Sequence, residues 1–290
     1  MANSEALNNG DSIPAATTFA VIFALLTVAN TFRLIRCRAW FCIPFIIGGI
    51  METTGYITRA LSSSNPTSTP LKIIQVLCIL LAPVLFAASI YMLLGRIIRA
   101  THGERYSPLR STWITQTFVL GDITCFIVQA IGAGVIAAGA SKNVGGNIVL
   151  GGLILQIVAF GVFAGVGGAF HVVFRRMLGR QGRVLNWKWE GHMGMLYVMS
   201  GLIGVRNIFR VVEYCMGVDG YLMNHEWPLY VFDAATMSMV LSFSLFSYGL
   251  SRVRGEDRLV KDIELDEDEN EDSSLRRGMG NILAKMPLIR

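Results

Sequence analysis

Seven long apolar runs occupy most of this 290-residue chain and leave it few folds to choose from. Each run is close to the ~20 residues that an α-helix needs to cross a bilayer. A backbone in lipid must satisfy its own hydrogen bonds, and runs of this length do so as helices. The runs are 14–32, 41–60, 71–94, 113–139, 148–174, 192–214 and 227–250. The sequence therefore predicts an all-α polytopic membrane protein with seven transmembrane helices.

The composition and the placement of positive charge support this fold class and give it an orientation. Only 16% of the residues are charged and 53% are hydrophobic, whereas soluble domains carry about 25% charged residues. Lys and Arg gather in alternate loops, and such loops face the cytosol. The basic segments are 33–40, 95–112, 175–191 and 251–262. We therefore expect the N-terminus outside and the C-terminus in the cytosol. We expect no nucleic-acid partner, because the basic residues lie beside the spans.

The chain divides into three predicted parts. Residues 1–13 form an extracellular N-terminal tail, residues 14–251 form the transmembrane domain, and residues 252–290 form a cytosolic tail. The last part contains a nearly continuous acidic run from Glu264 to Asp272. Such a run is typical of a solvated, disordered segment. This tail is the candidate contact for a cytosolic partner.

Ionisable residues inside the apolar runs are a second constraint on the fold. Arg206, Arg210 and Glu213 follow one another at spacings of four and three, so they share one helical face. Asp233 lies about two turns into the next run. A charge in hydrocarbon costs several kcal/mol unless it faces a partner or a water-filled cavity.

Pro83 lies inside the third run. Because Pro has no backbone N–H, it leaves one backbone carbonyl of that helix without its usual hydrogen-bond donor.

Other runs add polar residues at helical spacing. Glu52 and Arg59 are seven residues apart, and so are Asp122 and Gln129. With the predicted orientation, most of these residues lie in the outer half of the membrane. We predict that they meet around a polar cavity open to the outer leaflet. The candidate ligand-binding or polar network is Glu52, Arg59, Asp122, Gln129, Gln156, Arg206, Arg210, Glu213, Glu226 and Asp233.

These charges have two uses, between which the residues alone do not decide. Arginines suit an anionic or zwitterionic head group, and carboxylates suit an amine. Alternatively, the charges only hold the helices together, since buried ion pairs specify packing without binding a ligand. The partners of the two arginines of span six also stay open, with four carboxylates as candidates. Five aromatic residues lie near predicted interfaces, where we expect the default place in an aromatic belt: Tyr56, Trp113, Trp187, Trp227 and Tyr230.

Motifs of enzymes and metal sites are missing from the sequence. It contains neither the G-x-x-x-x-G-K-[ST] phosphate loop nor the H-E-x-x-H zinc motif. Of the four His, three lie toward the predicted cytosolic side and one lies outside. We therefore expect no enzyme, no catalytic residue, no cofactor and no metal site. Movement of a ligand would be passive, ion-coupled or driven by a partner.

The same polar residues carry a resemblance to a known family. Residues 206–214, RNIFRVVEY, followed by Asp233, resemble the signature of the fungal RTA-like family of lipid-translocating exporters. Residues 52–59, ETTGYITR, resemble the second-span motif of that family, and residues 118–134 resemble its fourth-span motif. One departure is Phe209, where the family often has Tyr. The acidic tail lies outside the resemblance.

The resemblance implies seven spans in a fungal plasma membrane, with the endoplasmic reticulum and the vacuolar membrane as alternatives. It implies a lipid-translocating exporter or similar transporter, in a family linked to stress and drug resistance. The ligand expected from it is an amphipathic lipid, such as a sphingoid base, a phospholipid, a sterol-like drug or a porphyrin. The alternative is a seven-helix lipid receptor or sensor that signals to a cytosolic partner. An intramembrane lipid-modifying enzyme is a further alternative, against which the scattered His argue.

Overall fold

The computed structural model describes residues 13–64, 69–100, 111–138, 142–181, 189–216 and 227–247. Across these ranges the chain is helical, and no strand occurs in them. They belong to one compact unit, Met1–Tyr248. Both predicted tails, apart from Ile13 of the first, lie outside the described residues.

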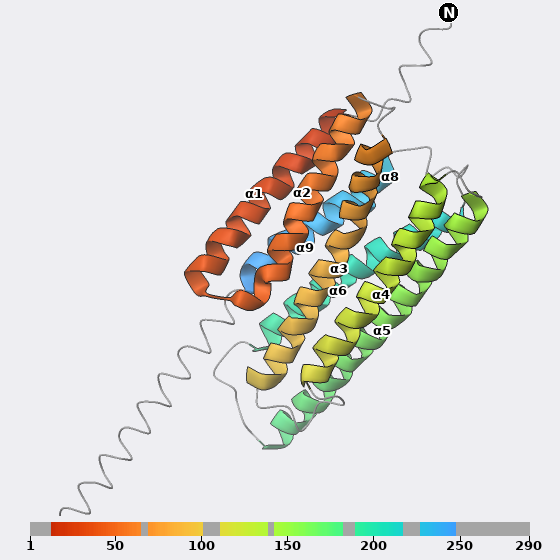
Figure 1. The fold of residues 1–290 in the computed structure, drawn as a ribbon. Helices are drawn as coiled ribbons and strands as arrows, with labels where there is room; N and C mark the ends of the chain where they lie inside the picture. The colour runs from red at the N-terminus through yellow and green to blue at the C-terminus, as the bar shows by residue number, and fades with distance from the viewer. Residues whose placement is uncertain are drawn as a thin grey trace, which may run out of the picture. The chain divides into compact units, whose positions relative to one another are not determined.

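Within the described residues, seven long helical segments make up the bundle (Figure 1). The first six are α1 (Ile13–Cys37), α2 (Ile43–Ser64), α3 (Thr69–Ala100), α4 (Ser111–Ala137), α5 (Lys142–Gln181) and α6 (Trp189–Cys215). The seventh runs without a break through α8 (Trp227–Leu229), the π-helical η3 (Tyr230–Ala235) and α9 (Thr236–Ser247). A short 3-10 turn, η1 (Trp40–Cys42), precedes α2. The predicted all-α polytopic architecture is confirmed.

Six of the seven segments are long and apolar enough to cross a membrane. The exception is α2, which has 22 residues but is less apolar because Glu52, Arg59 and several Thr, Ser and Gly interrupt it. Helix α5 has 40 residues, and at 1.5 Å per residue it is about 60 Å long. It extends past the predicted run 148–174 at both ends, because its polar flanks continue the helix beyond the apolar stretch.

The turn between α1 and α2 is fixed by a helix-ending motif. Arg38 follows the last residue of α1 with a φ of 48°, in the left-handed region. The backbone N–H of Ala39 then donates to the carbonyl of Leu34 at 3.3 Å. This pattern satisfies a carbonyl that a helix end leaves open. It lets α2 turn back and pack along α1.

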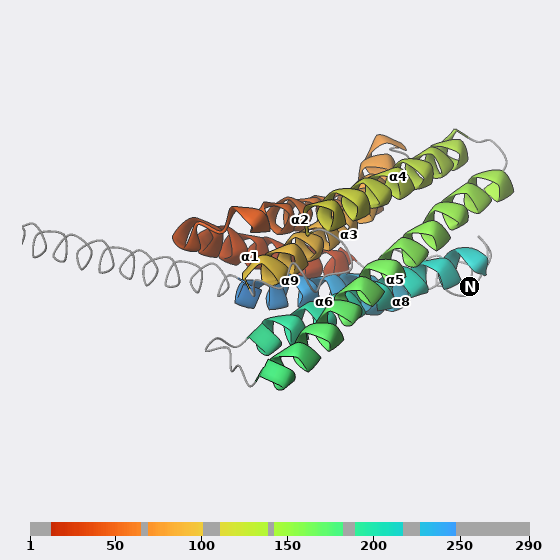
Figure 2. The ribbon, with the colours of Figure 1, turned by 90° about the horizontal axis from the view of Figure 1, so that it is seen from below.

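Helix α3 lies in the middle of the bundle. It packs against α2, α4, α6 and α9, and more of its span is buried than of any other candidate span among the described residues. Helices α1 and α2 lie on one side of α3, and α4 and α5 on the other (Figure 1). In the view from below, α6 and α9 run together beneath α3 (Figure 2). Residues of α2, α3, α6 and η3 can therefore meet inside the bundle.

Several polar residues of the helices are buried together with the apolar core, and many large apolar residues are exposed on the outside. In α1, Asn30 is buried while Val28 and Phe32 are exposed. The Asn30 side chain donates from Nδ2 to the Leu241 carbonyl at 3.1 Å and accepts from Ser244 Oγ at 2.7 Å. These bonds join α1 to α9. An outer surface of exposed Val, Ile, Leu and Phe is what a bundle in lipid requires.

Close contact between α4 and α5 depends on two glycines. A Cβ at Gly132 would lie 2.8 Å from the Gly145 carbonyl oxygen and 2.9 Å from the Val149 backbone nitrogen. A Cβ at Gly145 would lie 2.8 Å from the Gly132 carbonyl oxygen. Small residues of this kind let helix backbones approach in a membrane. The two helices are thus held at a separation that only Gly allows here.

We expect Gly132→Ala to destabilise the protein, because the new methyl group must push the α5 backbone away. The cost is about 1–3 kcal/mol, as for other overpacked sites, and thermal unfolding in detergent would measure it as a lower Tm. Gly134→Ala is the matched control in the same helix, since a Cβ there meets nothing within 4 Å. Equal Tm values for the two variants would contradict the close packing.

Candidate functional site

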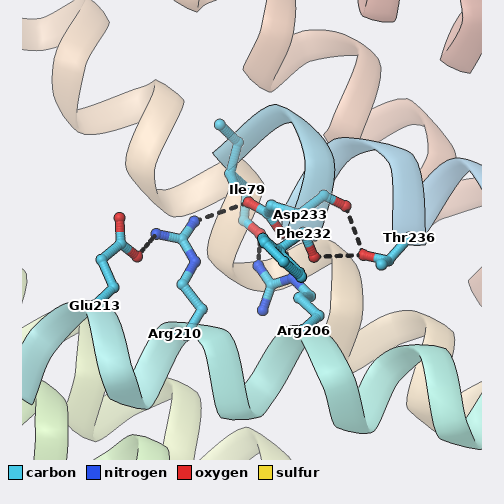
Figure 3. Close-up of polar contacts among 7 residues, drawn as sticks. All are labelled: Ile79, Arg206, Arg210, Glu213, Phe232, Asp233 and Thr236. Atoms are coloured by element: carbon cyan, nitrogen blue, oxygen red, sulfur yellow. Dashed lines mark hydrogen bonds and ion pairs between the residues drawn. The ribbon is translucent and has the colours of Figure 1, made fainter. Parts of the chain in front are cut away.

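The face of α6 that the sequence predicted is buried against α3 and η3. Arg206 is 2% exposed, and Arg210 and Glu213 are also buried. Their spacing of four and three residues sets the three side chains along one side of the helix (Figure 3). The three side chains therefore lie on one buried face of α6, as their spacing predicts.

A single carboxylate joins the two arginines. Asp233, which is 0% exposed, accepts from Arg206 Nε at 2.5 Å through Oδ1 and from Arg210 Nη2 at 3.0 Å through Oδ2. Arg210 Nη1 also donates to Glu213 Oε2 at 3.0 Å. Among the carboxylates that the sequence offered, the structure thus selects Asp233 and Glu213. We call Arg206, Arg210, Glu213 and Asp233 the ion cluster (Figure 3).

Pro83 explains why Arg206 also contacts the backbone of α3. Because Pro lacks an N–H, the carbonyl four residues earlier in the helix loses its usual donor. That carbonyl belongs to Ile79, and Arg206 Nη2 donates to it at 3.0 Å. The guanidinium of Arg206 therefore satisfies the carbonyl that Pro83 frees. This contact ties α3 to α6 and to the seventh segment at one point.

Asp233 reaches the arginines from an unusual stretch of helix. Tyr230–Ala235 is π-helical, a geometry that is rare and often found at functional sites. Thr236 Oγ1 donates to the carbonyls of Phe232 at 2.6 Å and of Asp233 at 2.9 Å, where the chain returns to α-helix (Figure 3). No residue pattern in this stretch signals the change in register.

Aromatic rings surround the polar residues on the α1 and α2 side. Tyr56 stacks on Phe23 with centroids 5.4 Å apart, and Tyr230 stacks on Phe19 at 5.7 Å. The Arg59 guanidinium lies 5.4 Å from the centre of the Tyr230 ring, and its Nε donates to the Tyr230 hydroxyl at 3.2 Å. The belt role expected for Tyr56 and Tyr230 is wrong, because both side chains are buried. Sequence position near a span end did not reveal that both face inward.

Glu52 lies beside the ion cluster but outside its bonds. The side chain is 1% exposed, and neither carboxylate oxygen has a hydrogen-bond partner among the described residues. Asp233, Arg206 and Arg210 lie within electrostatic range of it. Glu52 therefore lies near the other members of the predicted network, but no described residue donates a hydrogen bond to its carboxylate oxygens.

The remaining predicted residues form separate contacts. Asp122 Oδ2 accepts from the Tyr91 hydroxyl at 2.7 Å, beside Phe118 and Phe163. Tyr91 is twelve residues along α3 from Ile79, which is about 18 Å of helix. Asp122 is thus bonded at a different level of the bundle from the ion cluster.

The two predicted glutamines bind each other. Gln129 Nε2 donates to Gln156 Oε1 at 2.8 Å, and both side chains are buried between α4 and α5. In the described conformation the amides therefore satisfy one another across the helix interface. Glu226, the last member of the predicted network, lies outside the described residues.

Comparison with known proteins identifies relatives. The family described as RTA1 like protein matches residues 45–251, which include the whole ion cluster. Protoporphyrin uptake protein 1 of Saccharomyces cerevisiae is 40% identical over 208 residues, covering 71% of this chain and 68% of that protein. Protein RTM1 of the same species is 40% identical over 212 residues, covering 73% of this chain and 66% of that protein. Sphingoid long-chain base transporter RSB1, also of Saccharomyces cerevisiae, is 26% identical over 291 positions, covering 86% of this chain and 75% of that protein. No solved structure matches the chain.

Loss of the shared carboxylate should destabilise the bundle strongly. We expect Asp233→Asn to cost about 3–5 kcal/mol, because the buried guanidinium of Arg206 then lacks its counter-charge and Arg210 keeps only Glu213. Thermal unfolding of the purified protein in detergent would show the loss. The control is Glu190→Gln, which removes an exposed pair with Arg175 at 3.8 Å and should cost under about 1 kcal/mol. Similar Tm shifts for the two variants would mean that the ion cluster contributes no more than a surface pair.

The glutamine pair can be tested with a double-mutant cycle. We expect Gln129→Leu and Gln156→Leu each to cost about 1–3 kcal/mol, because each leaves one buried amide without a partner. The double variant should be nearly as stable as the wild type, since both amides are then gone. The Tm of the four proteins would measure the cycle. Additive losses would instead show that each glutamine has its own separate partner.

Proposed function

This chain belongs to the RTA1-like protein family, and we propose from that premise that it binds and moves an amphipathic lipid-like molecule across a membrane. It is an integral membrane protein by its helices and by its family. One relative is named for protoporphyrin uptake and another as a sphingoid long-chain base transporter. Ligands of these two kinds join a large apolar body to charged groups. A transporter-like role is therefore the function that the comparisons support.

The buried ion cluster is the observation that carries this proposal. Four ionised side chains inside apolar helices are expensive, and such residues mark ligand or ion pathways in membrane proteins. All four lie in the part of the chain that matches the family. Packing alone would be served by neutral contacts, and the bundle uses such contacts elsewhere, as between Gln129 and Gln156.

The proposed ligand would compete for charges that already have partners. An anionic head group would take Arg210 or Arg206 from Asp233, and an amine would take Glu213 or Asp233 from an arginine. Arg210 and Glu213 are the more accessible pair, with side chains 11% and 7% exposed against 2% and 1% for Arg206 and Asp233. We place the first contact of the ligand at this pair.

The orientation and the membrane belong to the same proposal. With the N-terminus outside, α6 runs outward, and its Arg210–Glu213 end lies toward the outer leaflet. We propose the plasma membrane as the location and an outer-leaflet route for the ligand. The ligand leaves chemically unchanged, since the role is transport rather than catalysis.

Lipid flux in liposomes tests the proposal. The purified protein would be reconstituted with labelled sphingoid base, phospholipid or protoporphyrin, beside the double variant Arg210→Met/Glu213→Leu. This variant removes the buried ion pair of Arg210 with Glu213 and leaves the ion pair of Arg206 with Asp233 in place. We expect flux to fall by about tenfold or more, because each ~1.4 kcal/mol lost from the rate-limiting state slows a process about tenfold. The Tm checks that the variant is folded.

The exposed pair supplies the matched control, Arg175→Met/Glu190→Leu, which makes the same chemical change outside the cluster. Its flux should equal that of the wild type. Unchanged flux in a folded Arg210→Met/Glu213→Leu protein would leave the cluster with a packing role only. If the wild type moves none of the three ligands but binds one saturably, and the cluster variant loses that binding, the receptor alternative replaces transport.

A further inference from the structure

Glu52 is a buried acid that accepts no hydrogen bond from the residues that the structure describes. It lies in α2, is 1% exposed, and both of its oxygens lack a hydrogen-bond partner among the described residues. The hydroxyl of Tyr56, one turn further along α2, is also buried and without a partner there. Buried polar groups in proteins are nearly always bonded. Two such groups on one helix face, next to an ion cluster, therefore need an explanation.

The groups that face Glu52 come from each neighbouring helix. Asp233 in η3, Arg206 and Arg210 in α6, and Cys78 in α3 are close enough to Glu52 to interact with it electrostatically. On the α1 side, the rings of Phe19 and Phe23 pack against Tyr56. Among the described residues, the charged groups that act on Glu52 are thus members of the ion cluster, while Arg59, two turns further along α2, acts on Tyr56.

The ion cluster is electrically balanced without Glu52. Arg206 and Arg210 carry two positive charges, and Asp233 and Glu213 carry two negative charges. Arg206 is further occupied by the Ile79 carbonyl. An ionised Glu52 would add a negative charge that no partner offsets. Burial of an unpaired carboxylate costs so much that the group takes up a proton instead.

From this charge balance and geometry we infer that Glu52 is a proton-binding site, and that its carboxyl holds a proton in the conformation described. The ligand of the site is the proton itself, which enters and leaves as an exchange with water. A neutral acid needs no counter-charge, which accounts for a buried Glu beside a neutral cluster.

Release of this proton would act on the ion cluster. The carboxylate left behind needs a cation, and the neighbouring cations are Arg206 and Arg210, which hold Asp233. Ionisation of Glu52 therefore competes with Asp233 for the arginines and loosens the seventh segment from α6. This coupling step rests on the proposed transport function, and it would make ligand movement proton-dependent. The proton site itself does not rest on that function.

Infrared spectroscopy of the unliganded protein tests the proton site. Glu52→Gln should remove the carbonyl-stretch band of a protonated carboxylic acid and change the Tm little, because one neutral group replaces another. Glu213→Gln is the matched control, a buried Glu bonded to Arg210. It should lower the Tm, and it should also weaken the band, because the cluster then carries an excess positive charge that favours ionisation of Glu52. Any band from Asp122 is shared by all three proteins and cancels in the difference spectra.

Two results would overturn the proton site. One is an unchanged acid band in Glu52→Gln. The other is a Tm that falls in Glu52→Gln as far as in Glu213→Gln, which would mean that Glu52 is an ionised partner of the arginines. Glu52→Asp provides a second readout that does not depend on Glu52→Gln folding. It keeps the acid, so it should shift the band rather than remove it, and an unshifted band would also contradict the site.

Flux under an imposed pH gradient tests the coupling. Flux of labelled lipid by the wild type should change with the gradient, and flux by Glu52→Gln should not respond to it. An equal response in both proteins would overturn the coupling. Absence of wild-type flux with every ligand would instead count against the proposed transport function, while the infrared result would still decide the proton site.

Discussion

The carboxylate of Asp233 is the interaction on which the interior of the bundle depends. It binds Arg206 with one oxygen and Arg210 with the other. Arg206 reaches on to the Ile79 carbonyl, so one acid connects the seventh segment, α6 and α3. Buried ion pairs are favourable only when geometry is good and further hydrogen bonds satisfy the remaining donors. The shared carboxylate, the second acid Glu213 and the carbonyl freed by Pro83 supply such bonds, while the buried Nε of Arg210 has no partner among the described residues.

Two kinds of polar contact occur inside the bundle, and they differ in what their disruption would do. Gln129 with Gln156, and Asn30 with Ser244, join pairs of helices through neutral groups. Such contacts fix the positions of the helices without placing ionised groups inside the bundle. The ion cluster instead holds four charges whose sum is zero, next to an acid that is not part of the balance. Gain or loss of one charge beside the ion cluster therefore changes several of its ion pairs at once. A neutral pair such as Gln129 with Gln156 does not respond in this way.

The helix architecture and the cluster were predictable to different degrees. The all-α bundle followed from the length of the apolar runs, because backbone satisfaction in lipid leaves helices as the solution for such runs. The common face of Arg206, Arg210 and Glu213 followed from helical periodicity. The π-helical stretch at Tyr230–Ala235 was not predictable, since nothing in residues 230–235 marks it and its register is held by contacts made across helices.

The sequence by itself therefore determined the number of long helices, the inward direction of their polar faces and the carbonyl that Pro83 leaves open. Tertiary structure decided the partners: Asp233 for both arginines, Tyr91 for Asp122, and the two glutamines for each other. It also buried Tyr56 and Tyr230 and left Glu52 without a hydrogen-bond donor among the described residues. The physical reason is that periodicity fixes which side of a helix a residue occupies. The depth and rotation of neighbouring helices, and so the atoms that meet, depend on how side chains from distant parts of the chain pack together.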